Sequence, residues 1–368
     1  MWEEILIKQR RVLHEENLDA LIAVSPENVG YTIGYMIPSQ VIPIRKRQFF
    51  AVVTPSNAAL VVVNVEYQEA LANSFIRDIR PYDEFKQNSI DVLADVLREF
   101  GVSEGRIGLE LDFLPARYYQ RLCRVLPKIE IVDAEHLYDQ MRMIKTEGEI
   151  KIMREIARIV DETHFDVYRT AKPGMSETDI AFMFIEGVLK RGCQEMRKLV
   201  VGSGERSVYA NCPPTKRVLQ IGDIMRVDVF ATLNGYLSDI ARTSVVGQPT
   251  PKQKEIWKKL CDAQTVAIES IRDGVTTQEV WNKFLDFFVS VGLNPGINFL
   301  GHSVGLTLHE EPFIDRYRNY ILRSNMILAI EPVYFWENQG FHLEDYVLVT
   351  QDGCELLSDG RGELPVIS

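Results

Sequence analysis

One stretch of the sequence, NFLGHSVGLTLHEEP at residues 298–312, carries side chains well suited to chemistry. It holds two of the chain's six histidines, His302 and His309, with glycines around the first and two acids beside the second. Imidazole binds metal ions and transfers protons near neutral pH. The pair could therefore be a metal site, a proton-transfer pair or two core histidines at a turn. This stretch alone does not distinguish these three interpretations.

The hairpin predicted at residues 224–246 carries two aspartates, Asp228 and Asp239, with the sequence LNG between its strands. A turn centred on Leu233 and Asn234 would place the two aspartates opposite each other across the ladder. Opposite residues project from the same face of a sheet. The hairpin therefore predicts one cross-strand pair of carboxylates.

A second hairpin, predicted at residues 326–350, carries Glu331 and Glu344 in the same way. A turn centred on Glu337 and Asn338 would make these glutamates opposite as well. Acids on strands usually alternate outward into solvent. Glu331, however, lies within MILAIEPVYF, which is apolar on both faces, so we expect its side chain to point inward.

Four inward carboxylates need compensating positive charge, because burying an unpaired carboxylate costs several kcal/mol and like charges on one face repel. Arg226 and Arg242 could supply part of that charge, whereas two divalent cations would neutralise the four acids directly. Oxygen-rich sites suit Mn²⁺, and an added imidazole extends the range to Co²⁺, Fe²⁺ or Zn²⁺. The residue types thus favour a two-metal centre.

The bulk composition limits the class of protein. At 368 residues the chain is long enough for two domains, and its net charge of −11 with scattered basic residues excludes a typical nucleic-acid-binding surface. The most apolar stretch, FFAVVTPSNAALVVVNV, is interrupted by PSN and indicates a hairpin, not a membrane span. The start of the chain lacks the apolar core of a signal peptide. The five widely spaced cysteines are typical of reduced thiols, so we expect a cytoplasmic protein.

The elements that must position these side chains fall into two groups. Residues 1–142 alternate strand-like and helical patterns, which predicts an α/β domain. A helix is predicted at residues 88–101, ending on Gly101. Strands are predicted at short apolar runs rich in β-branched residues, namely 18–24, 49–54, 59–64 and 106–111.

Residues 143–368 are predicted to form a second domain, in which helices pack on an antiparallel sheet. The hairpins lie between and after the helices, an order typical of an α+β layer arrangement. Ser176 is the expected N-cap of one helix, with Asp179 three residues further on. Helical patterns cover residues 147–170, 173–192, 251–272 and 277–291.

Four motifs in the second domain resemble, in order and spacing, those of the pita-bread metallopeptidase family, which includes methionine aminopeptidase, prolidase and aminopeptidase P. They are GDIMRVDVFATLNGYLSDIART, GHSVGLTLHEEP, AIEP and HLED. SPENVGYTIGY (25–35) resembles the N-terminal signature of the two-domain members, and MIKTEGEI (143–150) resembles the start of their second domain. The resemblance implies an α+β fold, with an N-terminal creatinase/prolidase-type α/β domain and a C-terminal pita-bread catalytic domain.

The resemblance implies two divalent metal ions held by Asp228, Asp239, His302, Glu331 and Glu344. It makes Asp239 and Glu344 the bridging ligands. Asp228 would bind one metal, and His302 and Glu331 the other. A water between the metals would have its pKa lowered enough to supply hydroxide near neutral pH. Mn²⁺ is the first choice of metal, with Co²⁺, Zn²⁺ and Fe²⁺ as alternatives.

The resemblance also implies two catalytic roles. Glu331 would take up the proton as the hydroxide attacks the substrate carbonyl. His309 matches the family's histidine that does not bind metal. It would donate a hydrogen bond to that carbonyl and stabilise the developing oxyanion.

Three positions expected to line the substrate pocket depart from the pattern of the proline-cleaving members. Asn211 and Asn298 stand where those members usually carry histidine, and His342 stands where arginine is common. Phe230 also replaces a common glycine. Asparagine still donates a hydrogen bond but cannot carry charge or relay a proton. The departures suggest a changed leaving group or a substrate without a peptide carboxylate.

The leading hypothesis is a dinuclear metallohydrolase that cleaves an amide bond, most simply an Xaa-Pro dipeptidase or aminopeptidase. The second is a non-peptide amidohydrolase or lyase acting on a small metabolite, motivated by Asn211, Asn298 and His342. The third is a catalytically silent binding module, which the five intact ligand residues argue against. The expected partner is a small peptide or small amide, with no nucleic acid and no membrane, and the resemblance implies a homodimer.

Overall fold

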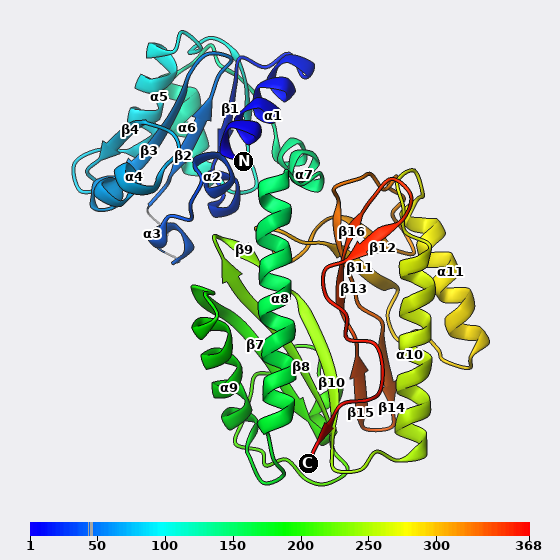
Figure 1. Ribbon diagram of the computed structural model, residues 1–368. Helices are drawn as coiled ribbons and strands as arrows, with labels where there is room; N and C mark the ends of the chain where they lie inside the picture. Colours follow the sequence, from blue (N-terminus) through cyan, green and yellow to red (C-terminus); the bar gives the residue numbers. More distant parts are fainter. Residues whose placement is uncertain (43, 45–46) are drawn as a thin grey trace. The chain divides into compact units, whose positions relative to one another are not determined.

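The computed structural model describes residues 1–42, 44 and 47–368. The chain divides into two compact units, unit 1 (Met1–Arg142) and unit 2 (Met143–Ser368), shown in Figure 1. Among the residues that the structure describes, every helix is too short or too polar to cross a bilayer. The predicted site residues all belong to unit 2.

Unit 1 contains a six-stranded sheet of mixed direction, with strand order β4-β3-β2-β1-β5-β6. Its strands are β1 (Ala20–Ala23), β2 (Phe50–Val53), β3 (Ala58–Val63), β4 (Asp78–Tyr82), β5 (Arg106–Leu109) and β6 (Glu130–Asp133). Its helices are α1 (Trp2–Glu15), α2 (Pro26–Ile33), α3 (Pro38–Val41), α4 (Tyr67–Asn73), α5 (Ser89–Glu99), α6 (Ala116–Val125) and α7 (Glu135–Met143).

The predictions for unit 1 are confirmed for four strands and one helix. The apolar runs became β1, β2, β3 and β5, and β2 and β3 form the expected antiparallel hairpin. The helix predicted at 88–101 is α5, followed by Gly101 with a positive φ of 74°. The pattern missed β4, of sequence DIRPY, and β6, of sequence EIVD, because both are short and mix charged with apolar residues.

Unit 2 repeats one order of elements twice: two helices followed by antiparallel strands. The first half comprises α8 (Glu147–Thr170), α9 (Glu177–Lys190), β7 (Glu195–Ser203), β8 (Ile224–Leu233), β9 (Tyr236–Leu237) and β10 (Ile240–Val246). The second half comprises α10 (Pro251–Glu269), α11 (Thr277–Ser290), β11 (Phe299–Ser303), β12 (Glu310–Asp315), β13 (Ile327–Ile330), β14 (Val333–Trp336), β15 (Gln339–His342), β16 (Asp345–Val349) and β17 (Cys354–Leu356).

The expectation of a single antiparallel sheet in unit 2 is wrong. One sheet has the order β18-β10-β8-β7, a second has the order β12-β11-β13-β16-β17, and β14 pairs only with β15. The short strand β18 (Val366–Ile367) runs parallel to β10. The segment 326–350 was predicted as one hairpin. Instead, the pair β13–β16 belongs to the second sheet, whereas the pair β14–β15 forms a separate two-stranded ribbon. The two pairs separate at Pro332 and Leu343.

The four long helices of unit 2 begin at the polar residues that the sequence places there. Each N-cap hydroxyl accepts a hydrogen bond from the third residue of its helix, whose side chain bonds back to the cap. The N-caps are Thr146, Ser176, Thr250 and Thr276. Helices α8 and α9 pack on the β7–β10 sheet, and α10 and α11 pack on the other sheet.

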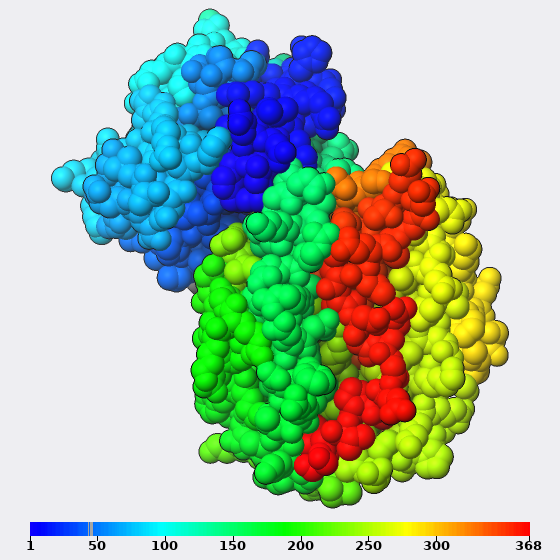
Figure 2. All heavy atoms as spheres, in the orientation of Figure 1, coloured from blue at the N-terminus to red at the C-terminus, as the bar shows by residue number. Residues whose placement is uncertain are grey.

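A large apolar cluster fixes the second half of unit 2. Trp257 of α10, together with Trp281 and Phe288 of α11, lies in this cluster with Leu300 of β11 and Ile330 of β13. These five side chains are at most 2% exposed. Figure 2 shows the C-terminal segment, in red, running between α8 and α10 on this face of unit 2. The strands that carry the site residues are thus anchored against buried helices.

We predict that Gly301→Ala destabilises unit 2. A Cβ at Gly301 would lie 2.1 Å from the carbonyl oxygen of Ala329 in the paired strand β13, and backbone cannot move aside cheaply. Overpacking of this kind costs about 1–3 kcal/mol. Gly353→Ala is the matched control, because its Cβ would meet no atom within 4 Å. Urea unfolding of the two variants checks the prediction, and equal midpoints would contradict it.

Candidate metal centre

The first carboxylate pair comes from β8 and the break after β9. Asp228 pairs with Ala241 across the β8–β10 ladder, so Asp239 lies two residues from that position and diagonal to Asp228. The predicted opposite placement is wrong, because the turn falls on Asn234 and Gly235, one residue later than expected. Both turn residues have positive φ, 52° and 86°. A displacement of two residues keeps the same face, so both carboxylates still project to one side.

The second pair, Glu331 and Glu344, lies where the ladders of β13–β16 and β14–β15 separate. The two ladders keep one register across this break, and Leu343 donates its N–H to the carbonyl of Pro332 within it at 3.3 Å. This register places Glu331 directly across from Glu344. The predicted turn at residues 337–338 is confirmed, because those two residues alone join β14 to β15.

His302, in β11, lies between the two carboxylate pairs. Its Nε2 is 3.2 Å from Glu331 Oε1 and 3.4 Å from Asp239 Oδ2, and the side chain is fully buried. Its Nδ1 lies 2.7 Å from the carbonyl oxygen of Ser303. A carbonyl only accepts, so Nδ1 donates, and Nε2 is the nitrogen that faces the acids.

The five predicted ligand residues therefore come together, and two further histidines join them. Possible ligand atoms lie within 4.8 Å of one another in three overlapping groups. The groups are Asp239 with His302 and His309, His302 with Glu331 and Glu344, and Asp228 with His342 and Glu344. His302 and Glu344 are each shared by two groups, whereas Asp239, the other expected bridging ligand, lies in one.

His309 is exposed, and its ring lies against the buried ring of His302, with 4.1 Å between the ring centroids. Phe299 and Phe313 each lie about 6 Å from both imidazoles. Loss of hydration and the charge of His302 lower the pKa of His309 to about 4. At neutral pH this ring is therefore a neutral hydrogen-bonding group.

The three positions assigned to the substrate pocket do not lie in equivalent places. Asn211 is exposed and accepts a hydrogen bond from Lys198 Nζ at 2.6 Å. Asn298 is exposed and lies 3.4 Å from the hydroxyl of Tyr317. His342, in contrast, is buried within the cluster, with Nε2 3.2 Å from Glu331 Oε2.

Neither arginine proposed as a counter-charge pairs with the four acids in the described part of the chain. Arg242 forms ion pairs with Asp161 and Asp345, each at 2.6 Å. Arg226 donates to the carbonyls of residues 209–210, and its Nη1 lies 3.4 Å from His342 Nδ1. The sequence analysis did not predict the contact of Arg226 with His342, because these residues are far apart in the sequence and share no motif.

Burial sets the protonation of the cluster. It raises the pKa of Asp239 to about 8 and the pKa of Glu344 well above its usual range. Burial alone would also raise the pKa of Glu331 and lower that of His302, but their mutual hydrogen bond, with those to Asp239 and His342, outweighs it. The pKa of Glu331 becomes about 2 and that of His302 about 10.

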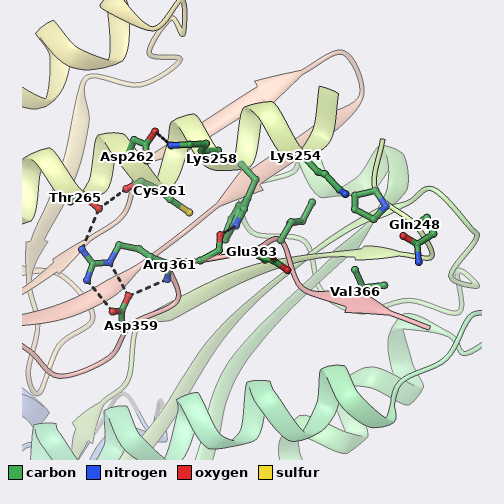
Figure 3. Close-up of a pocket in the computed structure, with 14 residues that line it drawn as sticks. Gln248, Lys254, Lys258, Cys261, Asp262, Thr265, Asp359, Arg361, Glu363 and Val366 are labelled. Carbon is green, nitrogen blue, oxygen red and sulfur yellow. Dashed lines mark hydrogen bonds and ion pairs between the residues drawn. The ribbon is translucent and has the colours of Figure 1, made fainter. Parts of the chain in front are cut away.

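A separate hollow of about 820 Å³ lies between α10 and the C-terminal segment (Figure 3). None of the cluster residues lines it. Its charged side chains include Lys258, which pairs with Asp262 at 2.6 Å, and Arg361, which pairs with Asp359 at 2.8 Å. Because these charges compensate one another, the hollow does not rival the cluster as a reactive site.

Family models match both units of the chain. The model described as Metallopeptidase family M24 matches residues 151–351, and the model described as Creatinase/Prolidase N-terminal domain matches residues 6–144. The first match alone covers more than half of the chain. The chain belongs to metallopeptidase family M24. Its fold is accordingly a C-terminal pita-bread domain with an N-terminal creatinase/prolidase-type domain.

Individual relatives agree with this family. The Xaa-Pro dipeptidase of Pyrococcus horikoshii is 29% identical over 96% of this chain and 96% of its own length. A probable dipeptidase, PepE, of Mycobacterium bovis is 33% identical over 70% of this chain and 69% of its own. The crystal structure of the prolidase from Pyrococcus horikoshii OT3 superposes with a TM-score of 0.84 at 28% identity, covering 98% of this chain and 99% of that one.

The cluster of this M24 metallopeptidase fits divalent metal ions. Among the described residues, Asp228 Oδ1 and both carboxylate oxygens of Glu344 are buried without a hydrogen-bond partner. Buried polar atoms are nearly always bonded, and a buried carboxylate needs a proton or a compensating cation. Carboxylate oxygens with one imidazole form a donor set for hard or borderline metals. The unpartnered atoms belong to two of the five predicted ligands.

We predict that metal binding to this M24 protein releases protons. At pH 7 the metal-free chain holds a proton on Asp239, with a pKa of about 8, and an extra proton on His302, with a pKa of about 10. Metals compete with these protons, so affinity should weaken as pH falls. Calorimetric titration with Zn²⁺ in buffers of different ionisation enthalpy should reveal release of two or more protons, because the pKa of Glu344 is raised as well.

His309→Gln is the control for this measurement, because His309 has a pKa of about 4 and carries no extra proton at pH 7. The variant should release as many protons as the unaltered chain. Heats that are independent of the buffer would contradict the prediction.

We also predict which ring nitrogen of the buried His342 carries its proton. His302 carries a proton on Nδ1, which faces a carbonyl, whereas Nδ1 of His342 faces the guanidinium of Arg226, which only donates. The proton of His342 therefore sits on Nε2, toward Glu331. ¹⁵N NMR of the histidine-labelled protein should show an unprotonated Nδ1 on His342, and Arg226→Met should remove this preference while Arg226→Lys preserves it. A protonated Nδ1 on His342 would contradict the prediction.

Proposed function

We propose that this metallopeptidase is an Xaa-Pro dipeptidase or aminopeptidase with a two-metal centre. The proposed metal is Mn²⁺, with Co²⁺, Zn²⁺ and Fe²⁺ as alternatives. The observation that carries the proposal is the cluster of four carboxylates and an imidazole, all buried except the partly exposed Glu331, with unpartnered carboxylate oxygens on Asp228 and Glu344. The proposed ligands are Asp228, Asp239, His302, Glu331 and Glu344.

Bound divalent ions would lower the pKa of water and polarise the scissile carbonyl. The chain's own residues supply the rest. His342 Nε2 holds Oε2 of Glu331 at 3.2 Å, and this contact does not depend on the proton of His302 that a metal ion would replace. This geometry fixes the carboxylate that takes up the proton of the attacking water.

His309 is proposed to bind the substrate carbonyl. Its neutral ring is exposed beside His302 and donates one hydrogen bond to the oxygen on which negative charge develops. Phe299 and Phe313 flank it and offer apolar surface to the substrate. The names of the relatives, Xaa-Pro dipeptidase and prolidase, support a peptide substrate.

Further proposals rest on the family resemblance. The two domains are residues 1–142 and 143–368, and the protein is a cytoplasmic homodimer. A second candidate function is hydrolysis or elimination on a small non-peptide amide. Asn211 and Asn298 favour it, since both expose an amide where proline-cleaving relatives carry histidine.

An activity panel tests the proposed function. The protein is loaded with Mn²⁺, Co²⁺ or Zn²⁺ and assayed on Xaa-Pro dipeptides, longer peptides and small non-peptide amides. We expect Xaa-Pro turnover, reduced about 100-fold or more in Glu331→Gln because the proton acceptor is lost. Glu355→Gln is the matched control, since Glu355 is an exposed residue of β17 paired with Arg154.

Turnover of non-peptide amides alone would replace the proposed function with the second candidate. If Glu331→Gln still cleaves Xaa-Pro substrates, Glu331 is not the proton acceptor of the reaction. If the protein binds metal but cleaves no substrate in the panel, the result would support the third hypothesis, a catalytically silent binding module.

A further inference from the structure

Lys198 shares a sheet face with the proposed ligands, although no sequence motif draws attention to it. On the β7–β8 ladder, Val200 pairs with Asp228 and Lys198 pairs with Phe230. Paired residues project to the same face, and residues two apart on a strand do so as well. Lys198 therefore lies on the face that carries Asp228, one paired position further along.

The ammonium group of Lys198 is held in place on that face. Its Nζ donates to Asn211 Oδ1 at 2.6 Å and lies 5.5 Å from the centroid of the Phe230 ring. An exposed cation is thus held in a defined position on the face that carries Asp228.

The pair of Lys198 and Asn211 matches a carboxylate. The ammonium has three donors, of which Asn211 takes one. Because the amide oxygen of Asn211 faces the lysine, its NH₂ group is directed away and is a second donor. Two neighbouring donors, one of them charged, suit the two oxygens of a carboxylate.

A small apolar cluster lies next to this pair. Val200, Cys212 and Phe230 are buried in it, and Leu308, the neighbour of His309, packs against it and stays partly exposed. A compact apolar ring could pack on Leu308 with its carboxylate directed to Lys198. A solvated lysine on a strand would be the ordinary interpretation, but it accounts for neither the 2.6 Å bond nor the shared face with Asp228.

We propose that Lys198, oriented by Asn211, binds the free carboxylate of the substrate residue on the leaving side of the scissile bond. The inference rests on the proposed function and narrows it, because a carboxylate directly after the scissile bond defines a dipeptide. In proline-cleaving relatives, a histidine or arginine is expected to supply positive charge to the substrate pocket. In this chain, Lys198 of β7 supplies that charge. Dipeptides, and not longer or amidated peptides, are the preferred substrate class.

The test compares Ala-Pro with Ala-Pro-amide on the metal-loaded protein. Loss of one charged hydrogen bond should reduce the ratio of their kcat/KM values about 10- to 100-fold in Lys198→Met. Lys198→Arg keeps the charge and should retain most of the ratio. Asn211→Asp leaves Lys198 present but neutralises it, and should lower the ratio as Lys198→Met does. Arg197→Met is the control, since Arg197 is the chain neighbour but pairs with Glu195 at 2.8 Å.

Binding of the products separates failure of this inference from failure of the proposed function. The Kd values of L-proline and L-prolinamide are measured on the metal-loaded protein, which needs no turnover. A preference for L-proline that is lost in Lys198→Met supports the inference even if Ala-Pro is not cleaved. An unchanged substrate ratio and an unchanged product preference in Lys198→Met would overturn it, whether or not Xaa-Pro turnover is observed.

Discussion

Mutual repulsion among four carboxylates, three of them buried and Glu331 partly exposed, is the constraint on which unit 2 depends. Asp228, Asp239, Glu331 and Glu344 have possible ligand atoms in overlapping groups less than 5 Å across, and no arginine or lysine forms an ion pair with them in the described part of the chain. Without cations, such an arrangement is tolerated only by holding protons and by pairing with imidazoles. The raised pKa values of Asp239 and Glu344 result from this crowding of buried acids. In an M24 metallopeptidase, divalent ions neutralise the negative charge.

The two halves of unit 2 each supply two of the four carboxylates. Each half uses two capped helices to support strands, and each half delivers two acids from strands or from the breaks beside them. Only the second half contributes the imidazoles, with His302 from β11 and His342 from β15. In the metal-free chain Glu331 receives one imidazole on each oxygen, so the group proposed to move a proton is held from two sides.

Much of this centre could be predicted from the sequence, because ligand types at hairpin spacing carry the information. The register of Glu331 and Glu344 followed from the turn at residues 337–338, whereas the pairing of the aspartates was two residues off, since the turn falls on Asn234 and Gly235, which both adopt positive φ. The separation of β14 and β15 into a ribbon could not be predicted, because tertiary packing decides which sheet a strand joins. The contact of Lys198 with Asn211 could not be predicted either, since Asn211 lies in the largely irregular segment between β7 and β8.

The position of β7 at the edge of its sheet has a consequence for how such enzymes diverge. An edge strand shares a ladder with one neighbour only, so a side chain there can be exchanged without disturbing the interior strands. The proposed metal ligands lie on or beside inner strands, β8, β10, β11, β13 and β16. Recognition and catalysis are therefore separable traits in this architecture. A lineage can acquire a new substrate by substitutions on β7 while its metal centre is inherited unchanged.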